Sequence, residues 1–143
     1  MIVDDVDPHF STQTKARKAA LDILFQADAR GLEIREVLAA QQGLANHPMR
    51  PLTRAIVHGV ADHLSSIDQR IAECCTNGWT LERMPRVDRS LARMAIFEID
   101  HTDTPDAVVV SEIMELASWL STNESPAFLN GLLGQAVRTH TTQ

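Results

Sequence analysis

The chain has 143 residues, of which 44% are hydrophobic, and this is enough for one domain with a buried core. Its formal net charge of −6 argues against a generic nucleic-acid binder, which usually carries a basic surplus. No apolar stretch approaches the roughly 20 residues of a membrane helix, and the acidic N-terminus does not resemble an export signal. The adjacent Cys74 and Cys75 are poorly placed for a structural disulfide. We therefore expect a cytoplasmic protein with reduced cysteines and no membrane partner.

The N-terminal part of the chain predicts an acidic tail followed by two helices. Residues 1–12 are expected to form a flexible tail, and residues 13–140 an all-helical domain. Small and aliphatic side chains recur at helical spacing over residues 14–29, and Gly31 is expected to close this helix. A shorter helix is expected from Ile34 to Gln42, with Gly43 ending it.

The middle of the chain predicts one long helix that begins at Pro51 and forms the backbone of the core. The sequence Asn77-Gly78 is expected to end it, and Thr80 to cap a short turn. Asp88 is expected to cap the next helix, which is apolar almost all round and should therefore be central. One face of the long helix is lined by Leu52, Ile56, Val60, Leu64, Ile67 and Ile71.

The last third of the chain predicts two helices, the second of which starts at Ser125-Pro126, where the hydroxyl can cap it. Gly131 and Gly134 lie inside that second helix, where each costs about 1 kcal/mol relative to alanine. We therefore expect a close approach of backbones at these glycines. The count is about seven helices with short connections and no strand, which predicts an all-α single domain.

No pattern in the sequence is typical of a catalytic or metal site. None of the six histidines is paired with another at the i, i+4 spacing of metal ligands. The H-E-x-x-H, C-x-x-C, phosphate-loop and nucleophile-elbow patterns do not occur in the sequence. We expect no catalytic residue, no metal and no cofactor.

The basic residues are unevenly placed, so any contact with a nucleic acid must be local. Residues 1–10 carry three aspartates and no basic residue, and Lys15, Arg17 and Lys18 then fall within four residues. Judged on these residues alone, an ordinary solvated helix start with a Lys18–Asp22 pair is the preferred interpretation.

Three segments, in the same order and with similar spacing, resemble the NusB family of bacterial transcription antitermination factors. They are KARKAALDILFQ, VDRSLARMAIFEI and SEIMELASWLSTNESPAFLNGLL, and the resemblance extends from Lys15 to Val137. It implies two packed helical subdomains. It also implies a factor that, with the ribosomal protein NusE, binds boxA-type single-stranded RNA and modifies RNA polymerase in the elongation complex, notably on rRNA operons.

The resemblance also implies roles for individual residues. Lys15 and Arg17 occupy positions of the family's RNA-binding arginine-rich segment, with Lys18 beside them, and Phe128 lies where it can stack on a base. Candidate partner contacts are Phe25, Glu82, Asp88 and Glu124. Each has a plainer alternative: an aromatic at the edge of the core for the phenylalanines, and solvated carboxylates for the acidic residues. For Asn130, a hydrogen bond between helices is preferred over an RNA contact.

A second hypothesis is a non-catalytic helical protein–protein interaction module with weakened or lost RNA binding, possibly a homodimer. It rests on the net charge and on Ser118 and Ala127, which stand where many family members carry Lys or Arg. A similar domain occurs attached to RNA methyltransferases, but this chain carries no cofactor motif of its own, so we expect no methyl transfer.

Overall fold

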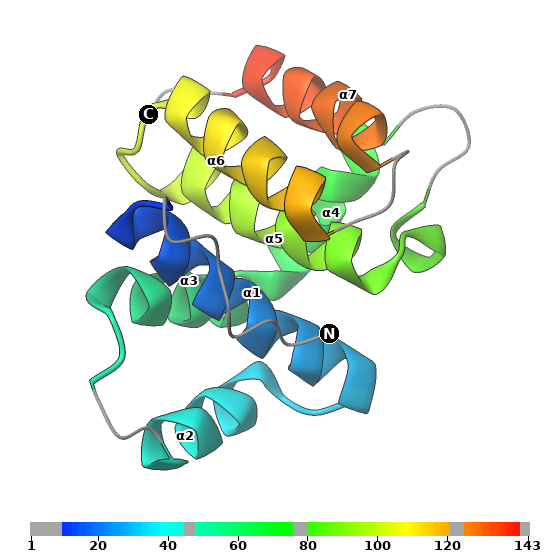
Figure 1. Ribbon diagram of the computed structural model, residues 1–143. Helices are drawn as coiled ribbons and strands as arrows, with labels where there is room; N and C mark the ends of the chain where they lie inside the picture. The colour runs from blue at the N-terminus through cyan, green and yellow to red at the C-terminus, as the bar shows by residue number, and fades with distance from the viewer. Residues whose placement is uncertain (1–9, 45–47, 76–79, 121–124, 141–143) are drawn as a thin grey trace. The chain divides into compact units, whose positions relative to one another are not determined.

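The computed structural model describes residues 10–44, 48–75, 80–120 and 125–140, and within these ranges it contains seven α-helices, one short 3-10 helix and no strand. The prediction of an all-α fold is confirmed. The chain divides into two compact units, residues 1–62 and residues 63–143 (Figure 1). The elements are α1 (Thr12–Arg30), α2 (Ile34–Leu44), α3 (Pro51–Asp62), α4 (Leu64–Cys74), η1 (Leu81–Arg83), α5 (Arg86–His101), α6 (Asp106–Leu120) and α7 (Ser125–Arg138).

Helix α1 is the centre of the first unit, because both α2 and α3 pack against it. Its N-terminus is capped by Ser11, whose side chain accepts a hydrogen bond from the backbone N–H of Thr14 at 3.1 Å. At its other end Gly31 adopts the left-handed conformation, with φ 66°, and its N–H donates to the carbonyl of Ala27. The predicted role of Gly31 is therefore confirmed, and the helix begins two residues before Thr14.

The small side chains of α1 allow α3 to come close. Ala16 and Ala20 are fully buried, and the hydroxyl of the buried Thr53 on α3 donates to the backbone carbonyl of Ala16 at 2.8 Å. A buried hydroxyl needs such a partner, so this bond fixes the register of the two helices.

The predicted end of α2 was wrong, because α2 runs to Leu44 and Gly43 lies inside it.

The long helix predicted from Pro51 is two helices in the structure, α3 and α4, separated at His63. His63 has φ −118° and ψ 20°, and its carbonyl accepts the first backbone bond of α4, from Ile67 at 2.8 Å. The apolar residues keep their helical spacing across this break, so periodicity alone could not reveal it. The break is also the boundary between the two units. The predicted stop at Asn77-Gly78 lies outside the described residues.

Helix α5 is the central helix of the second unit, as predicted, and it packs against α4, α6 and α7, with α6 and α7 side by side (Figure 1). Ten of its residues are buried. The cap predicted at Asp88 was wrong, because α5 begins at Arg86 after Pro85, and Asp88 lies inside the first turn with 2% of its surface exposed. Thr80 does cap η1, since its hydroxyl accepts a bond from the N–H of Arg83 at 3.3 Å.

The glycines of α7 do not provide the close backbone approach that the sequence predicted. A methyl group at Gly131 would meet no other atom within 4 Å. At Gly134 the nearest atom would be the flexible guanidinium of Arg138, at 3.3 Å. The side chain of Asn130 is exposed and makes no hydrogen bond with any described residue, so the expected bond between helices is not found there.

Candidate RNA and partner interface

The three cations at the start of α1 have different environments. Lys15 is half-buried and its ammonium makes no ion pair with any described residue. Arg17 and Lys18 are each only 4% exposed. The Nζ of Lys18 lies 2.5 Å from a carboxylate oxygen of Asp22, which confirms the predicted i, i+4 pair.

This difference in burial decides which cation can meet a phosphate directly. A buried cation needs partners that compensate its charge. A phosphate can take the place of these partners only if the cationic side chain moves to the surface or the atoms that cover it are displaced. Arg17 and Lys18 are both in this situation, whereas Lys15 can reach a phosphate without giving up an ion pair to a described residue. Of the predicted cluster, Lys15 is therefore the most accessible residue.

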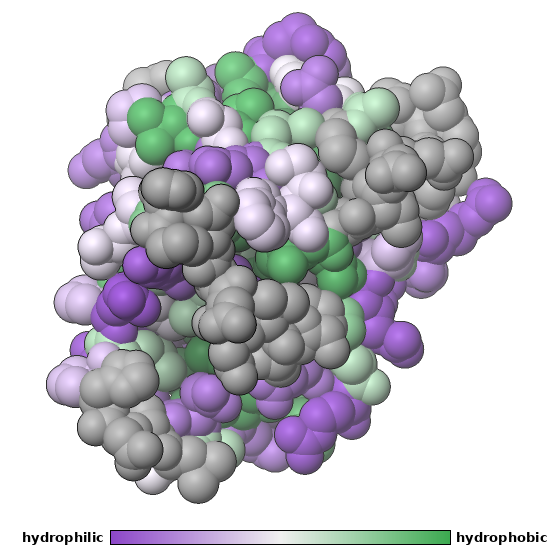
Figure 2. All heavy atoms as spheres, viewed as in Figure 1, coloured by the Kyte–Doolittle hydropathy of each residue, from purple (hydrophilic) through white to green (hydrophobic). Residues whose placement is uncertain are grey.

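The two predicted phenylalanines belong to different units. Phe25 on α1 and Phe128 on α7 are both half-buried, so each ring has part of its surface accessible to solvent. In the coloured part of the face in Figure 2, hydrophilic side chains lie beside smaller hydrophobic patches. Glu124 and the predicted cap at Ser125 lie outside the part of the chain whose side chains the structure describes.

A pocket of about 490 Å³ lies between α4 and η1 in the second unit. Two acidic residues, Asp68 and Glu82, belong to its wall, but their charges differ in availability. Asp68 is neutralised by Arg93 through two bonds of 2.8 and 2.9 Å. Glu82 is exposed and makes no ion pair with any described residue. The full lining is Asp68, Gln69, Ala72, Thr80, Leu81 and Glu82.

The pocket therefore presents one available carboxylate beside the apolar Leu81 and Ala72. Asp88, the other acidic residue predicted to face a partner, is only 2% exposed. The Asp68–Arg93 pair is mostly buried, with side-chain exposures of 25% and 14%. Sequence reasoning missed Asp68 because α4 and η1 are separate in the chain and no motif joins them.

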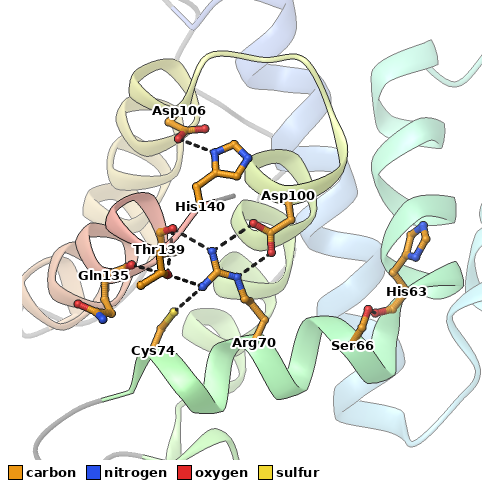
Figure 3. A network of polar contacts seen from close by, with 10 residues as sticks. His63, Ser66, Arg70, Cys74, Asp100, Asp106, Gln135, Thr139 and His140 are labelled. Atoms are coloured by element: carbon orange, nitrogen blue, oxygen red, sulfur yellow. Dashed lines mark hydrogen bonds and ion pairs between the residues drawn. The ribbon is translucent and has the colours of Figure 1, made fainter. Parts of the chain in front are cut away.

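A network around Arg70 connects the helices of the second unit (Figure 3). The guanidinium of Arg70 on α4 pairs with Asp100 on α5 at 2.9 Å and donates to the carbonyl of Ala136 on α7 at 2.9 Å. It also donates to the hydroxyl of Thr139 at 2.6 Å. The hydrogen bond to Asp100 raises the pKa of Arg70. Arg70 also donates to the thiol of Cys74, and burial raises the pKa of that thiol. These contacts stabilise the unit, and burial keeps the Cys74 thiol protonated.

The described residues show neither a metal-binding cluster nor a membrane-spanning helix. They contain no group of three or more His, Cys, Asp or Glu side chains arranged to hold a metal ion. Among the helices that the structure describes, none is both long enough and apolar enough to cross a membrane.

Comparison with known proteins gives consistent matches. Residues 14–138 match the model of the NusB family. The chain is 53% identical over 138 residues to the transcription antitermination protein NusB of Cutibacterium acnes, covering 95% of this chain and 52% of that protein. The chain thus spans about half the length of that relative.

Two solved structures have the same fold. NusB of T. maritima is 27% identical and superimposes with a TM-score of 0.80, covering 92% of this chain and 94% of that one. A crystal structure of the antitermination factors NusB and NusE in complex with dsRNA contains a chain that is 20% identical, with a TM-score of 0.75 and coverages of 90% and 97%. The family match spans nearly the whole chain and the helical architecture agrees with it, so this chain belongs to the NusB family.

Proposed function

We propose that this chain is a cytoplasmic transcription antitermination factor that, together with a NusE-type ribosomal protein, holds boxA-type single-stranded RNA beside RNA polymerase in the elongation complex. The observation that carries the proposal is the family match over residues 14–138. The name of the C. acnes relative and the presence of NusE and RNA in the crystal structure of a NusB chain support it. The proposed mechanism is non-catalytic and consists of binding two partners together.

For the RNA contact, Lys15 is the first phosphate ligand, because it is the most accessible of the three predicted cations Lys15, Arg17 and Lys18. Arg17 and Lys18 join after the RNA has displaced their present partners; for Lys18 this means exchanging Asp22 for a phosphate. Phe128 offers a partly accessible ring on which a base stacks, a contact typically worth about 1–3 kcal/mol. With so few cations, affinity is modest and depends weakly on salt.

For the partner contact, Glu82 is the central residue, because it is the exposed carboxylate of the α4–η1 pocket. A basic ribosomal protein would be attracted to it, and this attraction acts mainly on the rate of encounter and on specificity. Phe25 and Glu124 remain proposed contacts. Asp88 is almost fully buried, so it does not offer its carboxylate directly to a partner.

The two contacts reinforce each other when RNA and partner are held by the same protein. Each surface is weak alone: among Lys15, Arg17 and Lys18 only Lys15 is readily available, and among the described carboxylates that line the pocket only Glu82 makes no ion pair with a described residue. A partner that itself touches the RNA makes the second binding event intramolecular, which raises the overall affinity without a new contact on this chain.

The test is a titration of boxA RNA, with and without NusE, using the Lys15→Glu variant. One lost phosphate contact should reduce the salt slope by about 0.7, and the reversed charge should weaken binding by about tenfold or more. Arg54→Glu is the matched control, because Arg54 is an exposed cation on α3 and the charge change is identical. Arg17 is unsuitable, since a buried glutamate would also disturb folding.

Equal losses in the two variants would mean that only the overall charge matters, and the proposed RNA site would then be wrong. The alternative of a helical interaction module without RNA binding is less favoured, because the C. acnes relative is an antitermination protein. It would be supported if RNA failed to bind both in the presence and in the absence of NusE.

A further inference from the structure

The chain enters α1 at a point that is held in place. Phe10 is buried, with 9% of its surface exposed. Ser11 follows it as the N-cap, and the backbone carbonyl of Ser11 accepts a hydrogen bond from the N–H of Lys15 at 3.0 Å. The burial of Phe10 and the bonds of Ser11 therefore fix the point at which the preceding residues join the helix, one turn before Lys15.

An acidic segment stands in the sequence directly before this fixed point. Residues 4–7 read Asp-Asp-Val-Asp, and residues 1–14 contain no Lys or Arg. We call residues 4–7 the acidic segment; they lie outside the described part of the chain. Lys18 is paired with Asp22 on the same helix, whereas Lys15 makes no ion pair with any described residue. Opposite charges therefore flank the fixed point, with three carboxylates before it and the ammonium of Lys15 after it.

The acidic segment can reach Lys15 without any change in α1. Asp7 is three residues before Phe10, and three residues of extended chain span at most about 10 Å. Lys15 is four residues beyond Ser11, which is a rise of about 6 Å along a helix. The lysine side chain adds a flexible four-carbon stem to this reach. A carboxylate of the segment can therefore contact the ammonium of Lys15.

The covalent link makes this attraction effective. A single exposed ion pair is weak, but a short flexible link gives the carboxylates an effective concentration in the millimolar range near Lys15. Several carboxylates share this advantage, and RNA in solution does not have it. An RNA phosphate that approaches Lys15 therefore competes with negative charges that are already nearby.

We propose that the acidic segment is an intramolecular competitor of RNA. Its carboxylates associate with Lys15 in the RNA-free protein, and the phosphates of bound RNA displace them. The inference rests on the proposed RNA site at Lys15 and deepens it by naming how that site is regulated. RNA that the ribosomal partner also holds has a raised effective concentration at the site, so it overcomes the competition more readily than RNA that meets this chain alone.

The test compares two double variants that remove the same charge. Asp5→Asn, Asp7→Asn neutralises the acidic segment, and Glu33→Gln, Glu36→Gln neutralises two exposed carboxylates at the other end of α1. The part of α1 that follows Lys15 rises by about 22 Å, whereas the Debye length is about 10 Å at 0.1 M salt. In titrations of boxA RNA at this salt, the first variant should bind about three- to tenfold more tightly than the parent. The second should stay within about twofold.

Two further measurements test the contact at Lys15 itself. Without RNA, the NMR signal of the Lys15 Cε methylene should differ between the parent and the Asp5→Asn, Asp7→Asn variant. This difference should disappear at about 0.5 M salt, because salt screens exposed charges. With RNA, neutralising the acidic segment in a Lys15→Gln background should change affinity by less than about twofold, since the target ammonium is gone.

The inference is overturned if the two double variants tighten RNA binding equally, if neutralising the segment does not tighten it, or if the Lys15 signal does not move. It is also overturned if the competition depends on protein concentration, because the segment then acts on a second copy. Weaker NusE binding with unchanged RNA affinity would assign the segment to the basic partner instead. Absence of RNA binding in the parent and in both variants would refute the proposed function, and the Lys15 signal would then show separately whether the contact exists.

Discussion

Arg70 on α4 and Asp100 on α5 form a two-bond ion pair, with Nε–Oδ2 at 2.9 Å and Nη2–Oδ1 at 3.3 Å (Figure 3). Both side chains are about four-fifths buried, with exposures of 18% and 20%. Replacing Arg70 by methionine would leave the Asp100 carboxylate and the carbonyl of Ala136 without this donor. We expect a loss of about 2–4 kcal/mol in the free energy of unfolding, measured in urea.

The control for this prediction is the Arg35–Asp62 pair in the first unit. Its side chains are 57% and 54% exposed, so water screens the attraction. Arg35→Gln should change the free energy of unfolding by less than about 0.5 kcal/mol. If Arg70→Met were no more costly than Arg35→Gln, the network around Arg70 would not stabilise the fold.

The helical type of the elements was predictable from the sequence, because apolar periodicity and turn residues are local signals. As expected, Gly31 ends α1 in the left-handed conformation, and the hydroxyl of Thr80 caps η1. Both roles depend only on neighbouring backbone groups, so the local sequence reveals them. The break at His63 was not predictable, because the apolar residues keep their phase across it. The open space around Gly131 was also not predictable, because the sequence does not tell which face of α7 packs against another helix.

The second prediction concerns two glycines for which alanine should have opposite effects. Gly31 has φ 66°, a left-handed backbone conformation that is unfavourable for a residue with a side chain, although an added methyl group would have no atom within 4 Å. Gly31→Ala should therefore destabilise the protein by about 1–2 kcal/mol. Gly131 is an exposed helical residue with open space around it, and Gly131→Ala should stabilise the protein by about 0.5–1 kcal/mol. Thermal unfolding of both variants measures this. A destabilised Gly131→Ala would restore the expectation of close packing there.

The third prediction is a pH dependence that originates in His101. Its ring stacks on that of His63, with centroids 4.1 Å apart, and on Phe97 at 5.9 Å. Burial lowers the pKa of His101 and the charge of His63 lowers it further, whereas Asp100 acts in the opposite direction. The folded protein therefore holds His101 neutral at a pH where the unfolded chain already binds a proton, so stability falls as the pH drops below about 6.5.

His101→Asn removes this titration, so the variant should lose less stability than the parent between about pH 7.5 and pH 5. Unfolding in urea at several pH values checks it. His58→Asn, at an exposed position on α3, is the control and should follow the parent curve. An unchanged pH dependence in His101→Asn would mean that other groups control the acid sensitivity.

The candidate site was only partly predictable, for a physical reason. The sequence identifies Lys15, Arg17 and Lys18 as a cluster of cations, but it does not tell which of them are buried. The same holds for Glu82 and Asp88, which look alike in the sequence and differ in the structure as an exposed and a buried carboxylate. Burial is set by packing between distant segments, and a charged residue type alone does not predict it.

The fourth prediction concerns the partner surface at Glu82. Glu82→Lys places a positive charge in the α4–η1 pocket, next to Asp68, whose charge Arg93 already neutralises. A basic NusE-type partner should then bind at least about tenfold more weakly, mainly through slower association. Glu33→Lys, an equal charge change at an exposed position in the first unit, should leave the association rate within about twofold. Surface plasmon resonance measures both rates, and an equal decrease in the two variants would place the partner contact elsewhere.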